Sequence, residues 1–323
     1  MQLLDGQTIL ITGGTGSFGK TFVKHALEHT AARRIIIFSR DELKQYDMQQ
    51  EYRSESRLRF FLGDVRDYDR LLRAFDGVDC VVHAAALKQI PAAEYNPFEA
   101  VKTNVLGAKN IIDAAINQNV GNVVALSTDK ASSPINLYGA TKLVSDKLFV
   151  DGNAYVGASR RTRFAVVRYG NVVGSRGSVI PLFKKLAPTG VLPITDPRMT
   201  RFWLTLTQAV EMVMDSLTRM HGGEIFVPKI PSMRITDLAK AIAPEARLET
   251  VGIRYGEKLH EEMISMHDAY RTIDIGPCYV ICPDGDWWKE KAAHSSVPVA
   301  PDFSYTSDSN TQWLTVEQLR EMI

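Results

Sequence analysis

The feature of this sequence that most restricts its fold is a glycine-rich turn between an apolar run and a helical segment. The run Thr8–Thr12 predicts a short buried strand, and Lys20–Glu28 predicts a helix. Glycines between them permit a tight turn and let the backbone approach a pyrophosphate, which binds the free N–H groups of the helix. A merely flexible loop is the alternative. The expected phosphate-binding residues are Gly13, Thr15, Gly16, Ser17, Phe18 and Gly19.

The end of the second apolar run indicates which dinucleotide binds. A NAD-binding protein usually carries Asp or Glu there for the ribose diol, whereas this chain has Ser39 and Arg40, with Lys44 further on. Cations suit a 2′-phosphate, so we predict NADP; Asp41 favours NAD, and a solvated surface charge is the other explanation of Arg40. The remaining expected cofactor contacts are Asp64, Val65, Ala84, Ala85, Ala86, Asn104, Tyr138 and Lys142.

Strands alternate with helices over the first half of the chain, and this alternation is typical of a parallel, doubly wound sheet. We therefore expect an α/β fold: a Rossmann-like NADP-binding domain in residues 1–170, with a returning strand near 223–228, and a smaller substrate-binding domain with a C-terminal tail in residues 171–323. The six predicted strands are Thr8–Thr12, Arg34–Arg40, Leu58–Leu62, Asp79–His83, Val123–Leu126 and Phe164–Arg168.

Several helices and loops are also expected from local patterns. Lys88–Asn96 predicts a loop, and Pro97–Asn117 has helical spacing. The later expected helices are Thr205–Met220, Thr236–Ala243 with Thr236 as its cap, one that begins in Gly256–Met263, and a last one from Thr315 in which Gln318 completes a capping box.

A pair of motifs after the fifth predicted strand carries acid/base chemistry. Tyr138 and Lys142 are four residues apart, so they share a helix face. An ammonium near a phenol lowers a pKa that starts near ~10, and such a pair removes a proton from a substrate hydroxyl. Asp129 and Lys130 place a second couple at the carboxyl end of the strand, where open sheets bind ligands. A surface ion pair is the alternative for this couple.

Composition excludes several classes of function. The net charge of +1 gives no electrostatic basis for binding nucleic acid or a membrane surface. Three scattered cysteines suit a reducing compartment, and Cys278 and Cys282 lack partners at metal-site spacing, so we expect no metal. No apolar run reaches the roughly 18 residues of a membrane span, and the first residues lack a signal-peptide pattern. We expect a cytoplasmic protein.

Together these motifs resemble the extended short-chain dehydrogenase/reductase family, which acts largely on nucleotide sugars. The closer resemblance, over nearly the whole chain, is to the inverting UDP-N-acetylglucosamine 4,6-dehydratases, which open the route to pseudaminic acid. One departure is Tyr255, where the family commonly has Pro. The resemblance rests on Ser39–Lys44, Ala86–Pro91, Ser127–Lys130, Asn136–Lys142, Arg168–Gly177, Met199–Trp203 and Gly256–Glu261.

The resemblance implies an NADP-dependent reaction that regenerates its cofactor and gives UDP-2-acetamido-2,6-dideoxy-β-L-arabino-hex-4-ulose. Tyr138, tuned by Lys142, would be the base at O4, and Thr128 would hold O4. Lys130, neutral part of the time because burial or a nearby cation lowers its pKa, would remove the C5 proton. Asp129 would protonate the departing O6, with the reverse assignment of Asp129 and Lys130 as the alternative.

The resemblance also supplies the expected substrate contacts and assembly. A UDP-sugar diphosphate needs cations, and guanidinium groups give bidentate contact. The expected substrate-binding residues are Lys88, Asn171, Arg176, Arg201, Arg254 and Glu257, for which plain surface positions are the alternative. The tail Tyr305–Asn310 is expected to close over the substrate. Family members are homo-oligomers, often hexamers.

Two other functions compete with dehydration. A nucleotide-sugar 4-epimerase needs only Tyr138, Lys142 and the dinucleotide, so Asp129 and Lys130 speak against it. A non-catalytic NADP-binding regulatory protein would be expected to lack one of these four side chains, and all four are present.

Overall fold

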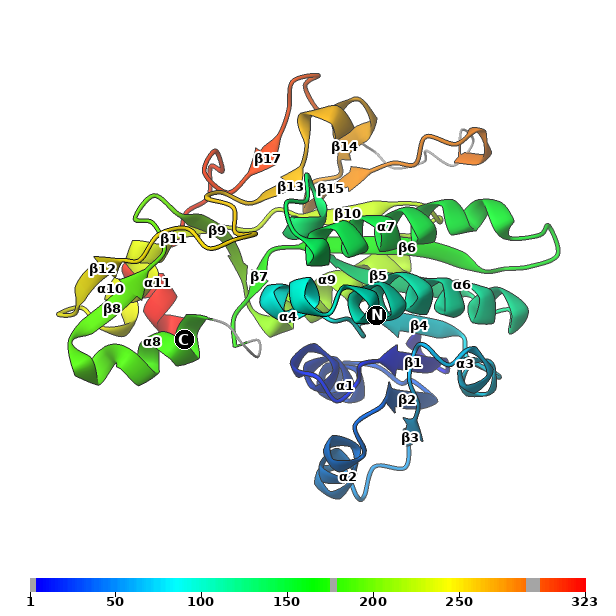
Figure 1. Ribbon diagram of the computed structural model, residues 1–323. Coiled ribbons are helices and arrows are strands. Elements are labelled where there is room, and N and C mark those ends of the chain that lie inside the picture. Colours follow the sequence, from blue (N-terminus) through cyan, green and yellow to red (C-terminus); the bar gives the residue numbers. More distant parts are fainter. Residues whose placement is uncertain (1–3, 175–178, 289–296) are drawn as a thin grey trace.

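The computed structural model describes residues 4–174, 179–288 and 297–323. Within these residues a ten-stranded sheet forms the centre of the molecule, in the order β16-β14-β15-β10-β6-β5-β4-β1-β2-β3 (Figure 1). Its strands are β1 Thr8–Thr12, β2 Arg34–Ser39, β3 Leu58–Leu62, β4 Cys80–His83, β5 Asn122–Thr128, β6 Arg163–Tyr169, β10 Ile225–Pro228, β14 Thr272–Asp274, β15 Cys278–Ile281 and β16 Val297–Pro298.

The first seven of these strands run parallel, and β15, β14 and β16 continue the sheet antiparallel. Strand β1 is buried along its whole length and pairs with β2 and β4 on its two sides. The order β3-β2-β1-β4-β5-β6 is that of a doubly wound dinucleotide-binding fold. The predicted α/β, Rossmann-like sheet is therefore confirmed, and β10 lies beside β6 as the returning strand.

Helices cover both faces of the parallel strands (Figure 1). On one face α1 packs against α9, and on the other α3 and α7 both pack against α6. In the part of the chain that the structure describes, no helix is long and apolar enough to cross a membrane. These helices are α1 Ser17–His29, α2 Glu42–Glu51, α3 Tyr68–Ala74, α5 Pro97–Val101, α6 Gly107–Asn117, α7 Leu137–Asp151 and α9 Leu206–Arg219.

A smaller body with its own hydrophobic cluster lies to one side of the sheet (Figure 1). Its core includes Phe183, Trp203 and Leu238. Strand β9 joins β7 and β11 in a short sheet, and β8 pairs with β12. The elements are β7 Asn171–Val172, α8 Val179–Leu186, β8 Val191–Ile194, β9 Thr200–Leu204, β11 Ser232–Arg234, α10 Ile235–Ile242, β12 Arg247–Thr250 and α11 Val316–Glu321.

Three local predictions are wrong. The expected loop Lys88–Asn96 contains helix α4 (Ile90–Tyr95), which has a proline in its first turn, where the missing N–H costs nothing. Thr236 is not a cap, because α10 already begins at Ile235. The helix expected from Gly256 is absent, since Gly256 has a left-handed φ of 76° and the following residues form strand β13 (Glu262–Ile264).

Strand β13 pairs with β17 (Tyr305–Thr306) from the C-terminal tail, a contact that the sequence did not predict. Two other local predictions are confirmed. Helix α9 follows Thr205, and α11 follows Thr315, whose capping box with Gln318 forms as expected.

Candidate active site

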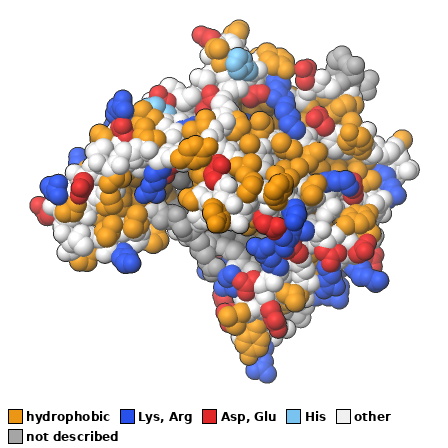
Figure 2. Space-filling view, in the orientation of Figure 1, with side chains coloured by type: hydrophobic (Ala, Val, Ile, Leu, Met, Phe, Trp, Pro, Cys, Tyr) orange, Lys and Arg blue, Asp and Glu red, His pale blue; other side chains and the backbone are white. Residues whose placement is uncertain are grey.

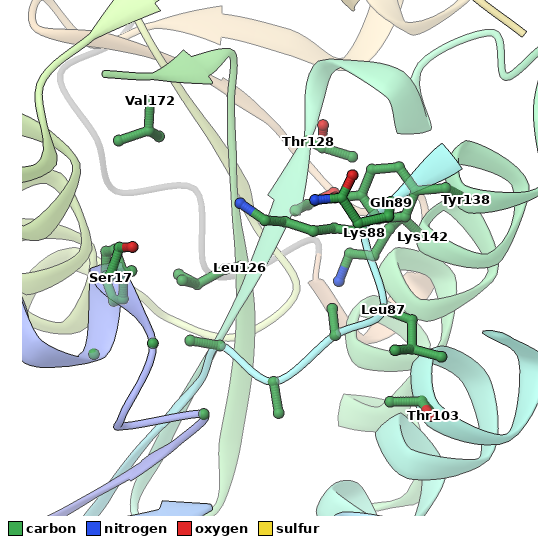
Figure 3. Close-up of a pocket in the computed structure, with 18 of the residues that line it drawn as sticks. Ser17, Leu87, Lys88, Gln89, Thr103, Leu126, Thr128, Tyr138, Lys142 and Val172 are labelled. Atoms are coloured by element: carbon green, nitrogen blue, oxygen red, sulfur yellow. The ribbon is translucent and has the colours of Figure 1, made fainter. Parts of the chain in front are cut away.

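A cavity of about 760 Å³ opens where the parallel strands end. Its wall combines the turn after β1 with the segments that follow β2, β4, β5 and β6. Figure 3 shows Ser17 on one side of this space and Thr128, Tyr138 and Lys142 on the other, with Lys88 extending between them. The carboxyl ends of parallel strands are where open sheets bind ligands.

The turn after β1 has the shape that a pyrophosphate requires. Gly13 has a φ of 66°, and a Cβ there would lie 3.1 Å from the backbone nitrogen of Ala85. Helix α1 begins at Ser17, at the cavity wall. Gly16 before it has no side chain to accept the first N–H groups of the helix, so these groups are free to bind a ligand in the cavity. Such N–H groups bind anions. The expected residues from Gly13 to Gly19 fit the diphosphate of a dinucleotide.

The segment after β2 brings the expected ribose contacts to the cavity wall. Ser39, Arg40, Asp41 and Lys44 all line it. Asp41 caps helix α2 by accepting the N–H of Lys44 at 3.0 Å, and its second oxygen pairs with the Lys44 ammonium. The guanidinium of Arg40 lies 3.7 Å from Asp64, another wall residue. The carboxylate that favoured NAD is thus engaged within its own helix.

A buried hydroxyl holds the backbone after β4. Oγ1 of Thr12 accepts the N–H groups of Ala84 and Ala85, each at 3.2 Å, so its own hydrogen points to Nδ1 of His83 at 2.8 Å. Burial, with a smaller effect of Lys142, lowers the pKa of His83 to about 3. His83 is therefore a neutral packed side chain, and Ala84, Ala85 and Ala86 form the cavity floor beside it.

Two expected cofactor residues have different positions. Val65 lines the cavity. Asn104 lies behind the wall, where its side chain accepts the N–H of Leu87 at 2.8 Å and donates to the Leu87 carbonyl at 2.9 Å. Its amide also donates to Thr141 at 3.0 Å. Asn104 thus connects the segment after β4 to α7, and the structure does not bring it to the cavity surface.

Tyr138 and Lys142 project from α7 into the cavity beside Thr128 (Figure 3). The helix starts where Asn136 accepts the N–H of Gly139 at 2.8 Å. Burial raises the pKa of Tyr138 to about 12, although the Lys130 ammonium opposes this rise. Burial also lowers the pKa of Lys142. A neighbouring ammonium therefore does lower the phenol pKa, but it is Lys130 and not the expected Lys142, and the net pKa is raised because burial outweighs this charge.

The couple after β5 is joined by a third charged group. Nζ of Lys130 lies 3.0 Å from Oδ1 of Asp129 and 3.1 Å from Oε1 of Glu261. Lys130 lines the cavity, and Asp129 is fully buried behind it. Sequence reasoning missed Glu261, because its motif was expected to start a helix. The only available signal was a carboxylate within the motif Gly256–Glu261.

Burial and ion pairing shift the pKa values of these three side chains in different directions. Burial by itself lowers the pKa of Lys130, but the charges of Asp129 and Glu261 outweigh it and raise this pKa. The predicted lowering of the Lys130 pKa is therefore wrong. Burial raises the pKa of Asp129 despite Lys130. Burial acts on Glu261 in the same direction, but Lys130 and Arg201 outweigh it and lower the Glu261 pKa. Burial thus raises the pKa of Asp129, whereas pairing raises the pKa of Lys130 and lowers that of Glu261.

The expected substrate contacts divide into three groups. Lys88, Asn171, Arg254 and Glu257 line the cavity, and burial together with the Lys130 charge lowers the pKa of Lys88. Arg176 lies outside the described residues. Wall residues that the sequence did not predict as contacts include Gln89, Tyr169, Leu206 and Tyr255.

Arg201 and the tail lie away from the cavity wall in the described structure. The guanidinium of Arg201 donates to the carbonyls of Lys258 and Leu259 at 3.0 and 3.1 Å, and its Nε lies 3.7 Å from Glu261. Ser307, in the tail expected over the substrate, accepts the N–H of Glu261 at 2.9 Å instead. Both therefore support Glu261 from behind.

Comparison with known proteins identifies the family. The sequence profile of the family described as "Polysaccharide biosynthesis protein" matches residues 9–283. The chain belongs to this family. The inverting UDP-N-acetylglucosamine 4,6-dehydratase of Campylobacter jejuni subsp. jejuni serotype O:23/36 (strain 81-176) is 53% identical over 99% of this chain and 98% of that protein. The resemblance noted in the sequence is confirmed.

Two further family relationships define the range of activities to consider. The UDP-glucose 4-epimerase of Rickettsia canadensis (strain McKiel) is 42% identical over 98% of this chain and 95% of that protein. The X-ray structure of Pen from Bacillus thuringiensis superimposes with a TM-score of 0.90 and 36% identity, over 100% of this chain and 98% of that one. Dehydration and epimerisation are thus the two reactions that the names of these relatives suggest.

Proposed function

We propose that this protein dehydrates UDP-N-acetylglucosamine across C4 to C6, with inversion at C5 and with NADP as its cofactor. The product would be UDP-2-acetamido-2,6-dideoxy-β-L-arabino-hex-4-ulose, at the start of pseudaminic acid synthesis. The observation that carries the proposal is the Asp129–Lys130 couple, with Lys130 in the same cavity wall as Tyr138 and Lys142. Oxidation at C4 needs only the Tyr138–Lys142 pair, whereas elimination needs a further acid and base.

The first chemical task is to take the proton from O4. Tyr138 is the proposed base, and Thr128 on the same wall is positioned to hold O4. Lys142 and Lys130 are the cations available to stabilise the phenolate, and the Lys130 charge already acts on Tyr138. A bound nicotinamide would supply reversible hydride acceptance. The residues from Gly13 to Gly19 would hold the diphosphate that places it.

Elimination follows because a 4-ketone acidifies the C5 hydrogen. Lys130 takes this proton in the fraction of molecules in which its amine is neutral, and Asp129 gives its proton to O6, which leaves as water. Burial raises the pKa of Asp129, which is the direction that a role as proton donor needs. The reverse assignment of Asp129 and Lys130 stays the alternative. Inversion requires that C5 is reprotonated from the opposite face, for which Tyr138 is the candidate.

The NADP preference is supported by the segment after β2. Asp41 is engaged with the backbone and ammonium of Lys44, and the cavity wall at the ribose end also carries Ser39 and the cation Arg40. Hydroxyl and cationic side chains suit a 2′-phosphate, whereas an NAD site uses a carboxylate for the ribose diol.

We also propose a homo-oligomer, with the hexamer as the form to test, in the cytoplasm. An exposed apolar surface over α4 and α7 supports self-association, and Figure 2 shows hydrophobic side chains gathered on this face. Large exposed apolar patches mark interaction sites. The residues of this surface are Tyr95, Phe98, Leu106, Ile135 and Val144. Light scattering of the purified protein measures the assembly.

Incubation with UDP-N-acetylglucosamine, followed by mass spectrometry and NMR in heavy water, tests the reaction. Dehydration removes the mass of one water and places deuterium at C5, and the ring configuration reports inversion. A product of unchanged mass would establish the epimerase instead, and no turnover would favour the regulatory protein. Tyr138→Phe is the matched variant, because it removes one hydroxyl and should abolish product formation while retaining the dinucleotide.

A further inference from the structure

Glu261 approaches Lys130 from a distant part of the chain. Its Oε1 lies 3.1 Å from Nζ of Lys130, and Oδ1 of Asp129 lies 3.0 Å from the same nitrogen. The same oxygen lies 3.7 Å from Nε of Arg201. The Glu261 side chain is 2% exposed and is not part of the cavity wall. Glu261 therefore acts on the cavity only through Lys130.

The backbone of Glu261 is held on both sides by one residue of the tail. Its N–H donates to Oγ of Ser307 at 2.9 Å, and its carbonyl accepts the N–H of Ser307 at 2.8 Å. Oγ of Ser307 in turn lies 2.7 Å from Oγ1 of Thr200, and all three residues are buried. Among the described residues, Oε2 of Glu261 has no hydrogen-bond partner. This carboxylate is thus fixed with one oxygen directed at the two cations.

The charges around Lys130 come from every element packed against it. Two carboxyl groups face the ammonium directly: the neighbouring cations lower the pKa of Glu261, whereas burial raises the pKa of Asp129. Both carboxyl groups attract the Lys130 ammonium, Asp129 from its own turn and Glu261 from a distant part of the chain. The titratable and charged neighbours are Asp129 on its own turn, Glu261 and Lys258 before β13, Arg201 on β9, Lys88 after β4 and Tyr138 on α7.

We propose that Glu261 is a positioning residue for Lys130: it orients the amine and stabilises the ammonium that forms when Lys130 accepts the C5 proton. The inference rests on the proposed function. In that step the C5–H bond breaks, its proton moves to Nζ, and its electron pair moves into the enolate of the 4-ketone. A carboxylate behind a histidine base has the same relation to the imidazolium that forms.

Glu261→Gln tests this role because it keeps the shape of the side chain and removes its charge. Competitive acetylation of Lys130 with acetic anhydride across a pH series, read by peptide mass spectrometry, reports the amine directly. We expect the labelling midpoint to fall by at least about one pH unit. The rising limb of the dehydration pH profile should move to lower pH, kcat on its plateau should fall roughly tenfold or more, and KM should stay unchanged.

Glu262→Gln is the matched control, because Glu262 is the next residue and its carboxylate accepts from Ser132 and Ser133 rather than from Lys130. It should leave the Lys130 midpoint and the pH profile as in the unmodified protein. Glu261→Asp draws the carboxylate back and should give an intermediate shift, which keeps the test available if Glu261→Gln does not fold.

An unchanged labelling midpoint in folded Glu261 variants would overturn the inference. So would a loss of activity that appears only in KM. Failure of the proposed function gives a separate result: the unmodified protein forms no dehydrated product. The labelling midpoints of Lys130 in the unmodified protein and in Glu261→Gln can still be compared in that case. A lowered midpoint with an unchanged plateau kcat would also overturn the role in proton transfer.

Discussion

Asp146 on α7 and Arg168 on β6 form an ion pair inside the protein, with 3.1 Å between Oδ2 and Nη2 and side chains only 2% and 3% exposed. Oδ2 of Asp146 also accepts the hydroxyl of Ser127 at 2.7 Å, and Arg168 donates to the carbonyl of Met263 at 2.9 Å. The pair therefore connects α7, β5, β6 and β13. These elements carry or adjoin the residues of both proposed acid/base couples.

Asp146→Asn should destabilise the protein strongly. The amide keeps the shape of the side chain but leaves the Arg168 guanidinium as an uncompensated buried charge, which costs about 3–5 kcal/mol of the free energy of unfolding. Asp215→Asn removes the exposed pair between Asp215 and Arg219 and should cost less than about 1 kcal/mol. Denaturant unfolding measures both. Equal losses in the two variants would contradict the bracing role of the buried pair.

Lys130→Met should abolish dehydration and retain dinucleotide binding. The side chain keeps its length but loses the proposed base, so kcat should fall at least about a hundredfold. Lys147→Met changes an exposed lysine of α7 and should behave as the unmodified protein. Product formation is followed by mass spectrometry, and the bound dinucleotide by fluorescence. A Lys130 variant with normal turnover would exclude Lys130 as the base at C5.

Gly13→Ala should weaken dinucleotide binding. The new Cβ would lie 3.1 Å from the Ala85 backbone, at a φ of 66° that costs a side chain about 1–2 kcal/mol. We expect a roughly tenfold rise in Kd, measured by calorimetry. Gly157→Ala is the control, because a Cβ at Gly157 meets nothing within 4 Å and its φ is ordinary. Identical affinities for the two variants would argue against a pyrophosphate at this turn.

Arg40→Ala should reduce the affinity for NADP and leave that for NAD nearly unchanged. Loss of a charge-assisted contact to the 2′-phosphate predicts roughly a tenfold rise in Kd for NADP alone. Arg34→Ala removes an exposed arginine from the other end of β2 and should affect neither dinucleotide. Parallel titrations with NADP and NAD decide the matter, and an equal loss for both would remove the argument for a 2′-phosphate site.

His83→Gln should change how stability depends on pH. Burial lowers the pKa of folded His83 from 6.5 to about 3, so below pH 6.5 the unfolded chain takes up a proton that the folded protein refuses. The contribution of a neutral His83 is present above this pH and is lost as the pH falls towards 3. Unfolding at pH 7.5 and at about pH 5 should show a larger loss for the unmodified protein than for the variant. Parallel losses would mean that His83 titrates normally.

Local patterns in the sequence were sufficient for the central sheet and its glycine turn. A strand buried on both faces is a continuous apolar run, as in Thr8–Thr12, and a glycine turn between strand and helix has few alternatives. The same holds for the capping box of Thr315 and Gln318, because all its atoms lie within one helical turn. Most of the expected cofactor residues follow from this, since they stand at the ends of predicted strands.

Positions that depend on distant contacts could not be predicted in this way. Strand β13 forms because the tail strand β17 pairs with it, and nothing near Gly256 in the sequence indicates that partner. The same contact brings Glu261 to Lys130. The predicted directions of the pKa shifts of Lys130 and Tyr138 were wrong for the same reason. The sequence shows that an ammonium and a phenol share a helix face, but it does not show how completely such groups are buried.

The sequence by itself therefore determined the fold class and the place of the glycine turn, and it was sufficient to propose the reactive side chains, because these depend on local spacing and apolar periodicity. Only the tertiary structure decided that Asp129 and Lys130 have a third partner, that Arg201 and Asn104 stand behind the cavity wall, and in which direction the pKa of each carboxyl group shifts. Those properties depend on burial and on through-space electrostatics, which the order of residues along the chain does not specify.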